Sequence, residues 1–476
     1  MDFNISVTAA ALATLSIAAT ARAQTAPIAP APAAAGPPAP APAAVAAPPA
    51  PAPAPIASPP APTGAPTQAP AAPAAIAPPP PPVAAPVPAP EIGGPVIELP
   101  SERDMPSLDL PRETAIENPL RGISAASATA IGGYGELTLN APSNAPAVVD
   151  LRRVVLFVGH NFNEHIRFYS ELEVEHAVAS STDQGEFEVE QAYLDGLFTP
   201  RFNLRAGLII MPVGIINVYH EPPTFNGVDR PQVDTLVIPS TWREPGFGIF
   251  GELATGLTYQ LYMVNGFNAN GFTAQTGIAD GHQEAQLAAA RDFGGVGRLA
   301  WEPRLATIFG VSAYGATSGN SLRSTVGSVP LLMFDADART RYRGFTARAE
   351  IAFLFIGDAG PLNQALLAGS PDQMLAVPVA SRLQGGYVEA GYDVLRLIAP
   401  STSQDITVFA RYDYANTQAE VPAGYVANPR FVRYTFIAGL VYRPIPEIGI
   451  KFDYGRHEFA AGPGFNEVAT ALTWMF

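Results

Sequence analysis

The chain has 476 residues, 27 basic and 42 acidic side chains, a formal net charge of −15 and no cysteine. The lack of cysteine excludes disulfides, Cys-ligated zinc, iron–sulfur clusters and thiol nucleophiles, and the acidic surplus argues against binding to nucleic acid, which needs clustered Lys and Arg. Only 14% of the residues are charged, yet no apolar run of about 18 residues occurs after the first 25 residues, which argues against α-helical membrane spans.

The N-terminal part of the chain predicts export and then disorder. Residues 1–23 are typical of a signal peptide, with an apolar stretch at 7–20 and a small-residue cleavage pattern, ARA, at its end. Residues 24–90 contain 26 prolines in 67 positions and no charged side chain, which predicts a disordered, partly polyproline II linker in the periplasm. This linker is interpreted as a spacer without a partner or, alternatively, as a tether that contacts the cell wall. Residues 91–130 are predicted to be an irregular leader.

Residues 131–476 contain sixteen short runs in which apolar and polar residues alternate, separated by turn-forming residues. The runs are approximately 131–140, 150–161, 165–177, 186–197, 203–213, 246–254, 257–265, 294–302, 305–317, 329–340, 344–356, 382–394, 404–415, 430–442, 447–457 and 464–476. Short gaps alternate with long ones, as in a barrel with turns on one rim and loops on the other. The fold class predicted is all-β: a sixteen-stranded antiparallel transmembrane β-barrel.

The two faces of these runs favour a membrane barrel over a soluble β-sandwich. Ile166 and Phe168 alternate with Arg167, Glu171 and Glu173, which fits lipid outside and water inside. The run GEFEVEQAYLD breaks the alternation, and this predicts either a β-bulge near Gln191 or a contact with another protomer.

The last run ends the chain on an aromatic residue. Leu472, Trp474 and Phe476 share one face, and this ending resembles the C-terminal signature read by the outer-membrane assembly machinery. The alternative is an ordinary edge strand, but an exposed apolar edge would invite aggregation.

A search for chemical motifs predicts no enzyme, no cofactor and no metal site. Gly246, Gly248 and Gly251 match the dinucleotide fingerprint GxGxxG, but no helix follows them to hold a pyrophosphate. There is no nucleophile elbow or P-loop. The histidines form no metal-binding pattern and are interpreted as strand-end or loop residues: His160, His165, His176, His220, His282 and His457. An outer-membrane enzyme is kept as an alternative function, ranked below a channel and a structural barrel.

Charged side chains on the inner-face positions are predicted to line a pore. An acidic strip is formed by Glu171, Glu173, Glu175, Glu188 and Glu190, whereas other strands carry Arg205, Arg298, Arg348, Arg411 and Arg433. Separate acidic and basic walls would set up a transverse electric field. The alternative is that these charges simply pair with one another and solvate the wall.

The third long connection, residues 214–245, is rich in proline and apolar residues and is therefore not expected to extend into solvent. Its charged and polar candidates for a constriction are His220, Glu221, Asp229, Arg230, Asp234, Arg243 and Glu244.

The segments VVLFVGHNFNEHIRFYSELEVEHA, GEFEVEQAYLD, FNLRAGLIIMPVGIINVYHEPPTFNGVDRP and VIPSTWREPGFGIFGE resemble porins of the phosphate-selective O/P type. The resemblance covers residues 150–252 and implies a homotrimeric outer-membrane channel with an infolded third loop. Many such porins begin with a coiled coil, which the Ala/Pro segment replaces here.

The predicted function is passive diffusion of ions and small hydrophilic solutes through a Gram-negative outer membrane, among lipid and lipopolysaccharide. The alternative is a structural barrel that anchors the envelope through its Ala/Pro arm. Residues 121–476 carry 24 basic and 34 acidic side chains, since 3 of the 27 and 8 of the 42 lie before residue 121. A negative wall concentrates cations within about a Debye length, so weak cation preference or near neutrality is expected in place of phosphate selectivity.

Overall fold

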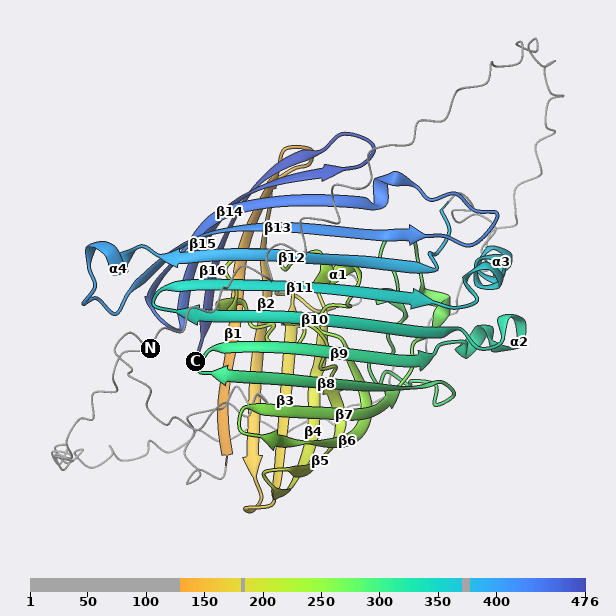
Figure 1. The fold of residues 1–476 in the computed structure, drawn as a ribbon, viewed down its shortest axis with the longest axis horizontal. Coiled ribbons are helices and arrows are strands. Elements are labelled where there is room, and N and C mark those ends of the chain that lie inside the picture. The colour runs from red at the N-terminus through yellow and green to blue at the C-terminus, as the bar shows by residue number, and fades with distance from the viewer. Residues whose placement is uncertain (1–128, 181–184, 370–376) are drawn as a thin grey trace, which may run out of the picture. The chain divides into compact units, whose positions relative to one another are not determined.

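A computed structural model describes residues 129–180, 185–369 and 377–476. These residues form a closed antiparallel barrel in which each of sixteen strands is hydrogen-bonded to the next and the last pairs with the first (Figure 1). The predicted signal peptide, the Ala/Pro linker and nearly all of the predicted leader lie outside the described residues. No helix in the described ranges is long and apolar enough to cross a membrane.

The strands are β1 (Thr129–Pro142), β2 (Val148–Asn161), β3 (Ile166–Glu175), β4 (Phe187–Thr199), β5 (Phe202–Ile210), β6 (Arg243–Ala254), β7 (Leu257–Asn265), β8 (Phe293–Arg304), β9 (Thr307–Thr317), β10 (Pro330–Tyr342), β11 (Phe345–Ile356), β12 (Arg382–Asp393), β13 (Asp405–Glu420), β14 (Val432–Ile445), β15 (Ile448–Phe459) and β16 (Phe465–Met475). The α-helices are α1 (Val233–Leu236), α2 (Arg323–Val326), α3 (Ala359–Gly369) and α4 (Leu395–Ile398). The 3-10 helices are η1 (Pro222–Thr224), η2 (Ala269–Gly271), η3 (Ala279–Gly281), η4 (Asn320–Leu322) and η5 (Pro429–Phe431).

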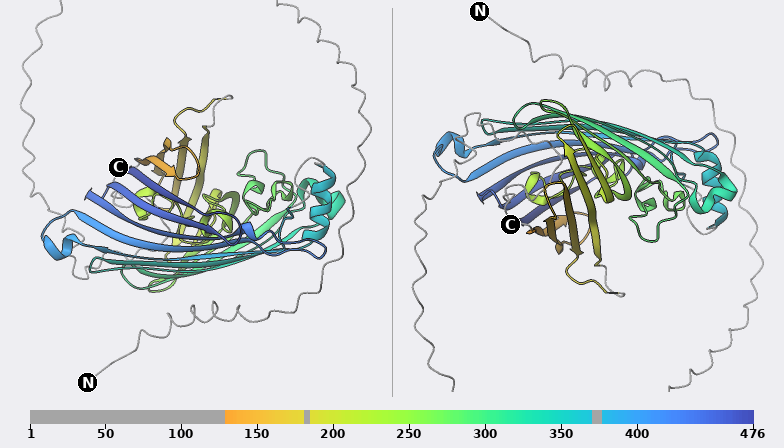
Figure 2. Two further views of the ribbon diagram at one scale, coloured as in Figure 1. Left: turned by 90° about the horizontal axis from the view of Figure 1, so that it is seen from above. Right: turned by 90° about the horizontal axis from the view of Figure 1, so that it is seen from below.

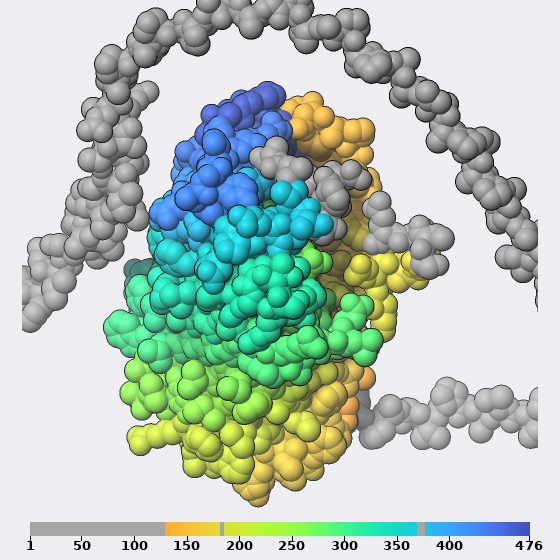
Figure 3. Space-filling model, turned by 90° about the vertical axis from the view of Figure 1, so that its right-hand side faces the viewer, coloured from red at the N-terminus to blue at the C-terminus, as the bar shows by residue number. Residues whose placement is uncertain are grey.

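All sixteen predicted strands are present, and the prediction of the barrel is confirmed. Short turns connect the strands at one rim, except between β12 and β13, where α4 lies. The opposite rim carries the long loops, including α2 and α3 (Figure 1). Figure 3 faces this loop rim, where the green and cyan parts of the chain crowd together. Figure 2 shows the barrel from two further sides.

The outer face of the barrel is apolar, as a lipid-facing surface must be. Large side chains at alternate strand positions are exposed there, among them Val154, Leu156, Ile166, Leu194, Leu261, Met263, Phe334, Ile351, Val388, Phe436, Ile450 and Phe452. Aromatic residues gather near the rim of short turns: Phe198, Phe202, Trp301, Phe309, Tyr342 and Phe345. Such a girdle marks the level of the lipid head groups.

Two bulges break the strand alternation at one wall. Between β3 and β4 the register shifts so that Gln191 pairs with Glu171 and Val189 pairs with Leu172, which leaves Glu190 as the extra residue. This confirms the bulge predicted near Gln191. Between β1 and β2 the extra residue is Arg152. Because a bulge offsets the period of two, neighbouring residues can both point inward.

The barrel closes where the end of the chain meets β1. The N–H of Phe476 donates to the carbonyl of Gly133, and the N–H of Gly133 donates to the carbonyl of Phe476, at 2.9 and 3.0 Å. Both residues lie on the outer face, and a Cβ atom on Gly133 would come within 3.0 Å of the Phe476 ring and 2.4 Å of the Val155 carbonyl oxygen. Trp474 covers Gly135 in the same way. Because Gly133 and Gly135 have no side chain, the rings of Phe476 and Trp474 can lie directly over the backbone of β1.

We expect Gly133→Val to lower the yield of closed barrel, because the new side chain would collide with the backbone of β2 as well as with the Phe476 ring. The fraction of heat-modifiable, compactly migrating protein on gels measures closure. Gly295→Val is the matched control, since a Cβ atom at Gly295 has open space around it. Equal folded fractions of the two variants would show that the Gly133 contact does not limit closure.

Candidate functional site

The third loop, residues 211–242 and called L3 below, lies inside the barrel. Its base is fixed by Asn217, whose side-chain N–H donates to the carbonyl of Met211 at 2.8 Å and whose oxygen accepts from the N–H of Trp242 at 2.6 Å. L3 contributes buried apolar side chains: Met211, Val213, Ile215, Ile216, Phe225, Val233, Val237, Ile238 and Trp242. These pack against inward-facing aromatic residues of the strands: Tyr134, Phe157, Tyr169, Tyr193, Tyr262, Tyr314 and Tyr387. Burial of this apolar surface holds the loop within the barrel.

Polar contacts attach L3 to the wall formed by β10 to β15. The N–H groups of Gly214 and Ile215 donate to Asp335 and Glu350, each at 3.1 Å. Farther along the loop, the N–H of Val228 donates to Asp453 at 2.7 Å. Other contacts of the same kind join Asn226 to Glu389, and the Lys451 ammonium group to the Gly227 carbonyl. Most of these bonds use the loop backbone, so the inward carboxylates position L3 largely through its N–H groups.

The predicted acidic strip lies on the opposite wall, and the structure brings its five glutamates together. The Cα atoms of Glu173 and Glu188 are register partners, and carboxylate oxygens of Glu173, Glu175 and Glu188 lie within 4.8 Å of one another. All five point inward, but Glu171, Glu173 and Glu190 are 1%, 1% and 0% exposed. L3 covers this deeper part of the strip, whereas Glu175 and Glu188 remain partly exposed.

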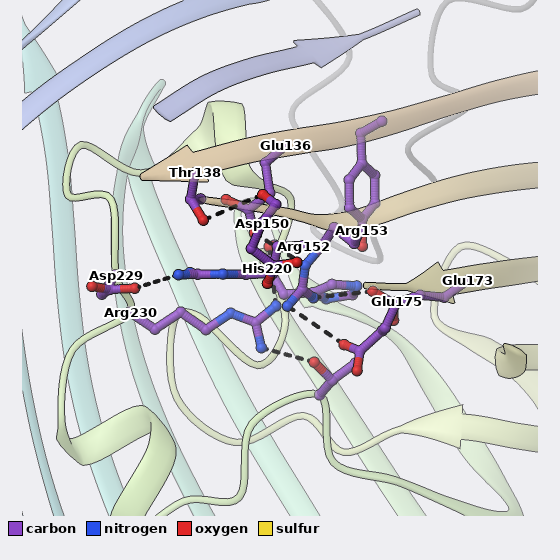
Figure 4. A network of polar contacts seen from close by, with 12 residues as sticks. Glu136, Thr138, Asp150, Arg152, Arg153, Glu173, Glu175, His220, Asp229 and Arg230 are labelled. Atoms are coloured by element: carbon purple, nitrogen blue, oxygen red, sulfur yellow. Dashed lines mark hydrogen bonds and ion pairs between the residues drawn. The ribbon is translucent and has the colours of Figure 1, made fainter. Parts of the chain in front are cut away.

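Arg153 is the main countercharge of the acidic strip (Figure 4). Its guanidinium group lies 3.1 Å from Glu136, 3.3 Å from Glu173 and 3.7 Å from Glu175. Its neighbour Arg152 also points inward because of the bulge, and it lies 2.9 Å from Asp229 in L3. Adjacent arginines thus connect the wall and the loop, an arrangement that simple alternation would not predict.

His220 meets the acidic strip from the L3 side. Its Nε2 atom lies 3.3 Å from Glu171 and 3.7 Å from Glu190, and the imidazole is 3% exposed. Burial alone would lower the pKa of His220, but the carboxylates of Glu171 and Glu190 outweigh it and hold that pKa well above its usual value. His220 lies in the third loop, as predicted, but the prediction that the histidines form no cluster with carboxylates was wrong for it, because it is buried together with two glutamates.

A group of arginines lies on the wall across from the acidic strip, on β10, β11 and β14. Arg339 and Arg348 are direct cross-strand neighbours, and Arg443 pairs with Asp405 at 3.1 Å and donates to the Pro223 carbonyl of L3 at 3.4 Å. L3 reaches this wall too: Arg348 donates to the Thr224 carbonyl, and the Arg339 guanidinium lies 3.4 Å from the centre of the Tyr219 ring. Residues 219–224 therefore cross the interior from the acidic wall to the basic wall.

The other predicted pore arginines have partners of their own. Arg205 pairs with Asp195 at 2.8 Å, Arg298 with Asp337 at 2.7 Å and Arg411 with Asp413 at 3.0 Å. Arg411 also donates to the Asp229 carbonyl in L3. Arg433 lies near the loop rim, 5.9 Å from the Phe431 ring. Of the predicted arginines, Arg348 is the one that joins the basic wall beside L3.

The predicted loop residues divide into two groups. Glu221, Asp229, Arg230 and Asp234 lie in L3 with His220, and Arg230 donates to the hydroxyls of Ser240 and Thr241. Arg243 and Glu244, however, are not loop residues: they begin β6 and pair with Ile210 and Ile209 of β5. The predicted loop, 214–245, was thus displaced toward the C-terminus, because the apolar run before Gly214 continues past the end of β5 and the proline at 245 suggested a loop.

Sequence reasoning missed Arg153, Arg339 and Arg443. The inward positions of Arg339 and Arg443 could have been found from strand alternation. The inward position of Arg153 could not have been predicted without knowing the register at the bulge. The contact of His220 with Glu171 could not have been predicted either, because it joins residues 49 positions apart.

Comparison with known proteins shows which family the chain belongs to and which known fold it shares. No family model matches the chain. An uncharacterized protein of Aquifex aeolicus (strain VF5) is 35% identical over 352 residues, which cover 73% of this chain and 79% of that protein. The OmpF structure from Salmonella typhi, in complex with daunomycin, is similar with a TM-score of 0.51 and 12% identity, over 73% of this chain and 97% of OmpF. The outer-membrane channel DcaP of Acinetobacter baumannii gives a TM-score of 0.46 and 11% identity, over 73% and 97% of the two chains.

The fold is thus a porin-type β-barrel, as the likeness to OmpF and the sixteen closed strands show. Within that fold class, the chain belongs to the family of the Aquifex aeolicus protein.

Asp234 in helix α1 is the loop carboxyl most affected by its surroundings. Both of its oxygens are buried without a hydrogen-bond donor among the described residues, and it lies within hydrogen-bonding reach of the Glu350 carboxyl. Burial, followed by the charge of Asp335, raises the pKa of Asp234 to about 8. A proton shared by the two carboxyls would therefore hold α1 against β11.

We expect the thermal stability of the barrel to fall as the pH is raised from about 6 to 9, with Asp234 contributing part of the fall. The folded state binds a proton at Asp234 that the unfolded chain releases near pH 4, so this contribution is present at low pH and is lost as the pH passes about 8. Asp234→Asn should make the midpoint temperature of thermal unfolding depend less on pH. Asp280→Asn, at an exposed loop position, should not change this dependence. Identical curves for wild type and Asp234→Asn would contradict the assignment.

Proposed function

We propose that the protein is an outer-membrane porin through which ions and small hydrophilic solutes diffuse passively, with L3 narrowing the pore. One observation supports this proposal above all: a closed barrel with an apolar outer face encloses a charged interior that L3 crosses. Sixteen strands enclose more space than inward side chains can fill, so an internal loop is a means of setting the pore size. In this proposal no residue carries out chemistry on the solute.

The two charged walls support a mechanism of charge sieving. Partly exposed Glu175 and Glu188 lie on one side of L3, and Arg339 and Arg348 lie on the other. Opposed walls set up a transverse field, in which cations and anions prefer different sides and polar solutes become oriented. This arrangement favours hydrophilic solutes over apolar ones, because only the former gain from the field.

Within this function, weak selectivity fits better than the phosphate preference implied by the resemblance to phosphate-selective O/P porins. Anion-selective pores need a surplus of exposed basic groups, whereas here Arg205, Arg298, Arg411 and Arg443 each pair with an aspartate. The arginines beside Arg348 offer a path for anions, and Glu175 with Glu188 offers one for cations. We therefore infer near-neutral or weakly cation-selective conduction.

The proposal extends to location and partners. The apolar outer face and aromatic girdle fit the lipid and lipopolysaccharide of an outer membrane, and Leu472, Trp474 and Phe476 would serve as the signal read by the assembly machinery. The resemblance to O/P-type porins supports a homotrimer. The Ala/Pro arm would extend into the periplasm, where contact with the cell wall remains the alternative role.

Planar-bilayer recording of the purified full-length protein tests the channel directly. We expect stepwise conductance increments, because water and ions should fill the space that L3 leaves open. The control is heat-denatured protein at the same detergent concentration. Folded, heat-modifiable protein that inserts without conducting would eliminate the channel and favour the envelope-anchoring alternative.

Charge substitutions on the two walls should move selectivity in opposite directions. Arg339→Gln with Arg348→Gln should shift the reversal potential toward cations, and Glu175→Gln with Glu188→Gln toward anions, each changing the permeability ratio by roughly twofold or more, since a local charge acts within a Debye length. Glu164→Gln in an exposed turn is the matched control, with 83% of its side chain exposed. Shifts of the same sign in both double variants would contradict the opposed-wall mechanism.

A further inference from the structure

Glu171, Glu190 and His220 form a compact set of potential metal ligands between L3 and the barrel wall. They come from β3, β4 and L3, and one ligand atom from each lies within 4.8 Å of the others. Each residue is at least nine-tenths buried, with exposures of 1%, 0% and 3%. Because the two glutamates belong to the wall and the histidine to the loop, anything bound among them would connect the two.

The distances in this cluster leave room for a cation shared by the three side chains. The Nε2 atom of His220 lies 3.3 Å from Glu171 Oε1 and 3.7 Å from Glu190 Oε2. Charge-assisted hydrogen bonds are shorter, about 2.7 to 2.9 Å. In contrast, ligands bound tetrahedrally to zinc at about 2.0 to 2.1 Å are roughly 3.3 Å apart. The observed separations are therefore close to those that zinc would impose.

The outer contacts of the three side chains hold them ready for a metal. The Nδ1 atom of His220 faces the Asn217 carbonyl at 3.3 Å, and since a carbonyl only accepts, Nδ1 carries a hydrogen there; Nε2 faces the glutamates and would bind a metal after releasing its proton. Gln191 donates to the second oxygen of Glu171 at 2.5 Å. Such secondary hydrogen bonds are typical of histidine and carboxylate ligands in metal sites.

Glu190 lies among other carboxyl groups, within hydrogen-bonding reach of the Glu173 carboxyl. Glu190 Oε1 is buried and has no hydrogen-bond donor among the described residues, while the other oxygen, Oε2, accepts from the Tyr134 hydroxyl at 3.4 Å. Arg153 and Arg243 form ion pairs with other glutamates of the strip: Arg153 with Glu173 and Glu175, and Arg243 with Glu188. Within the described ranges, His220 is the only basic side chain in an ion pair with Glu171 or Glu190. The protonated His220 is one cation that offsets the desolvation of these carboxylates, and a metal ion bound in place of its proton would do the same.

The rest of the acidic strip lies beside the cluster and is partly exposed. Glu175 and Glu188 are partly exposed, with side-chain exposures of 29% and 23%, and their carboxylates lie beside that of buried Glu173. In the proposed site, Glu175 and Glu188 would be the first carboxylates that an entering divalent cation meets. An entry path is one requirement of a functional metal site.

We propose that Glu171, Glu190 and His220 bind a divalent transition-metal ion, with Zn²⁺ as the best match, and that this ion fastens L3 to β3 and β4. Mixed imidazole and carboxylate ligation suits Zn²⁺ better than Ca²⁺ or Mg²⁺, which prefer all-oxygen sites. The bound ion would fix the position of residues 219–224 between the two charged walls. The site is independent of the channel proposal, because the ion can be counted whether or not the barrel conducts.

The test is zinc binding by purified full-length protein at pH 8, where competition from protons is reduced. Isothermal titration with Zn²⁺ and metal analysis after gel filtration should give about one ion per chain for the wild type. His220→Gln and Glu190→Gln should each weaken binding more than about tenfold, and His282→Gln, which changes another loop histidine paired with Glu284, should leave it unchanged. Heat-modifiability on gels verifies that each variant is folded.

Two results would overturn the site. Wild-type protein with no more zinc than His220→Gln would show that a proton on Nε2 occupies this position instead of a metal. Zinc binding that survives both His220→Gln and Glu190→Gln would place the ion elsewhere. If one variant fails to fold, Co²⁺ added to the wild type decides the matter: a tetrahedral d–d absorption that Zn²⁺ displaces supports the site, and its absence contradicts it.

Discussion

The pairing of β16 with β1 is the constraint on which the rest of the structure depends. In lipid, an unpaired sheet edge would leave a row of N–H and C=O groups without partners, so a sheet can span the membrane only when it is closed. The last residue takes part directly, since Phe476 exchanges two backbone hydrogen bonds with Gly133. Closure also separates an outer face, which must be apolar, from an interior that can hold charge.

Closure creates a second problem, because sixteen strands enclose a space too wide for side chains to fill. L3 fills part of this space, because its apolar residues lie inside the barrel and pack against the inward tyrosines. Its backbone N–H groups are satisfied by inward carboxylates such as Asp335, Glu350 and Asp453. The acidic residues of this barrel thus have two uses: some hold the loop, and others face the remaining space.

The two bulges explain how one wall gathers so much charge. Strict alternation would allow only every second residue of β2 and β4 to face inward, but the extra residues Arg152 and Glu190 break that limit. As a result, Arg152 reaches Asp229 in L3 while Arg153 reaches Glu136 and Glu173. The acidic cluster at His220 depends on the same offset, since Glu190 and Gln191 both lie beside Glu171.

The sequence by itself determined the number and order of the strands, the inward and outward faces, and the acidic strip, because alternation and turn residues are local signals. It also predicted a buried third loop from the apolar composition of that segment. Only the tertiary structure decided where L3 touches each wall, that Arg243 and Glu244 belong to β6, and that His220 lies beside Glu171 and Glu190. These contacts join residues far apart in the chain and depend on register shifts, and no pattern of period two encodes the position of an extra residue.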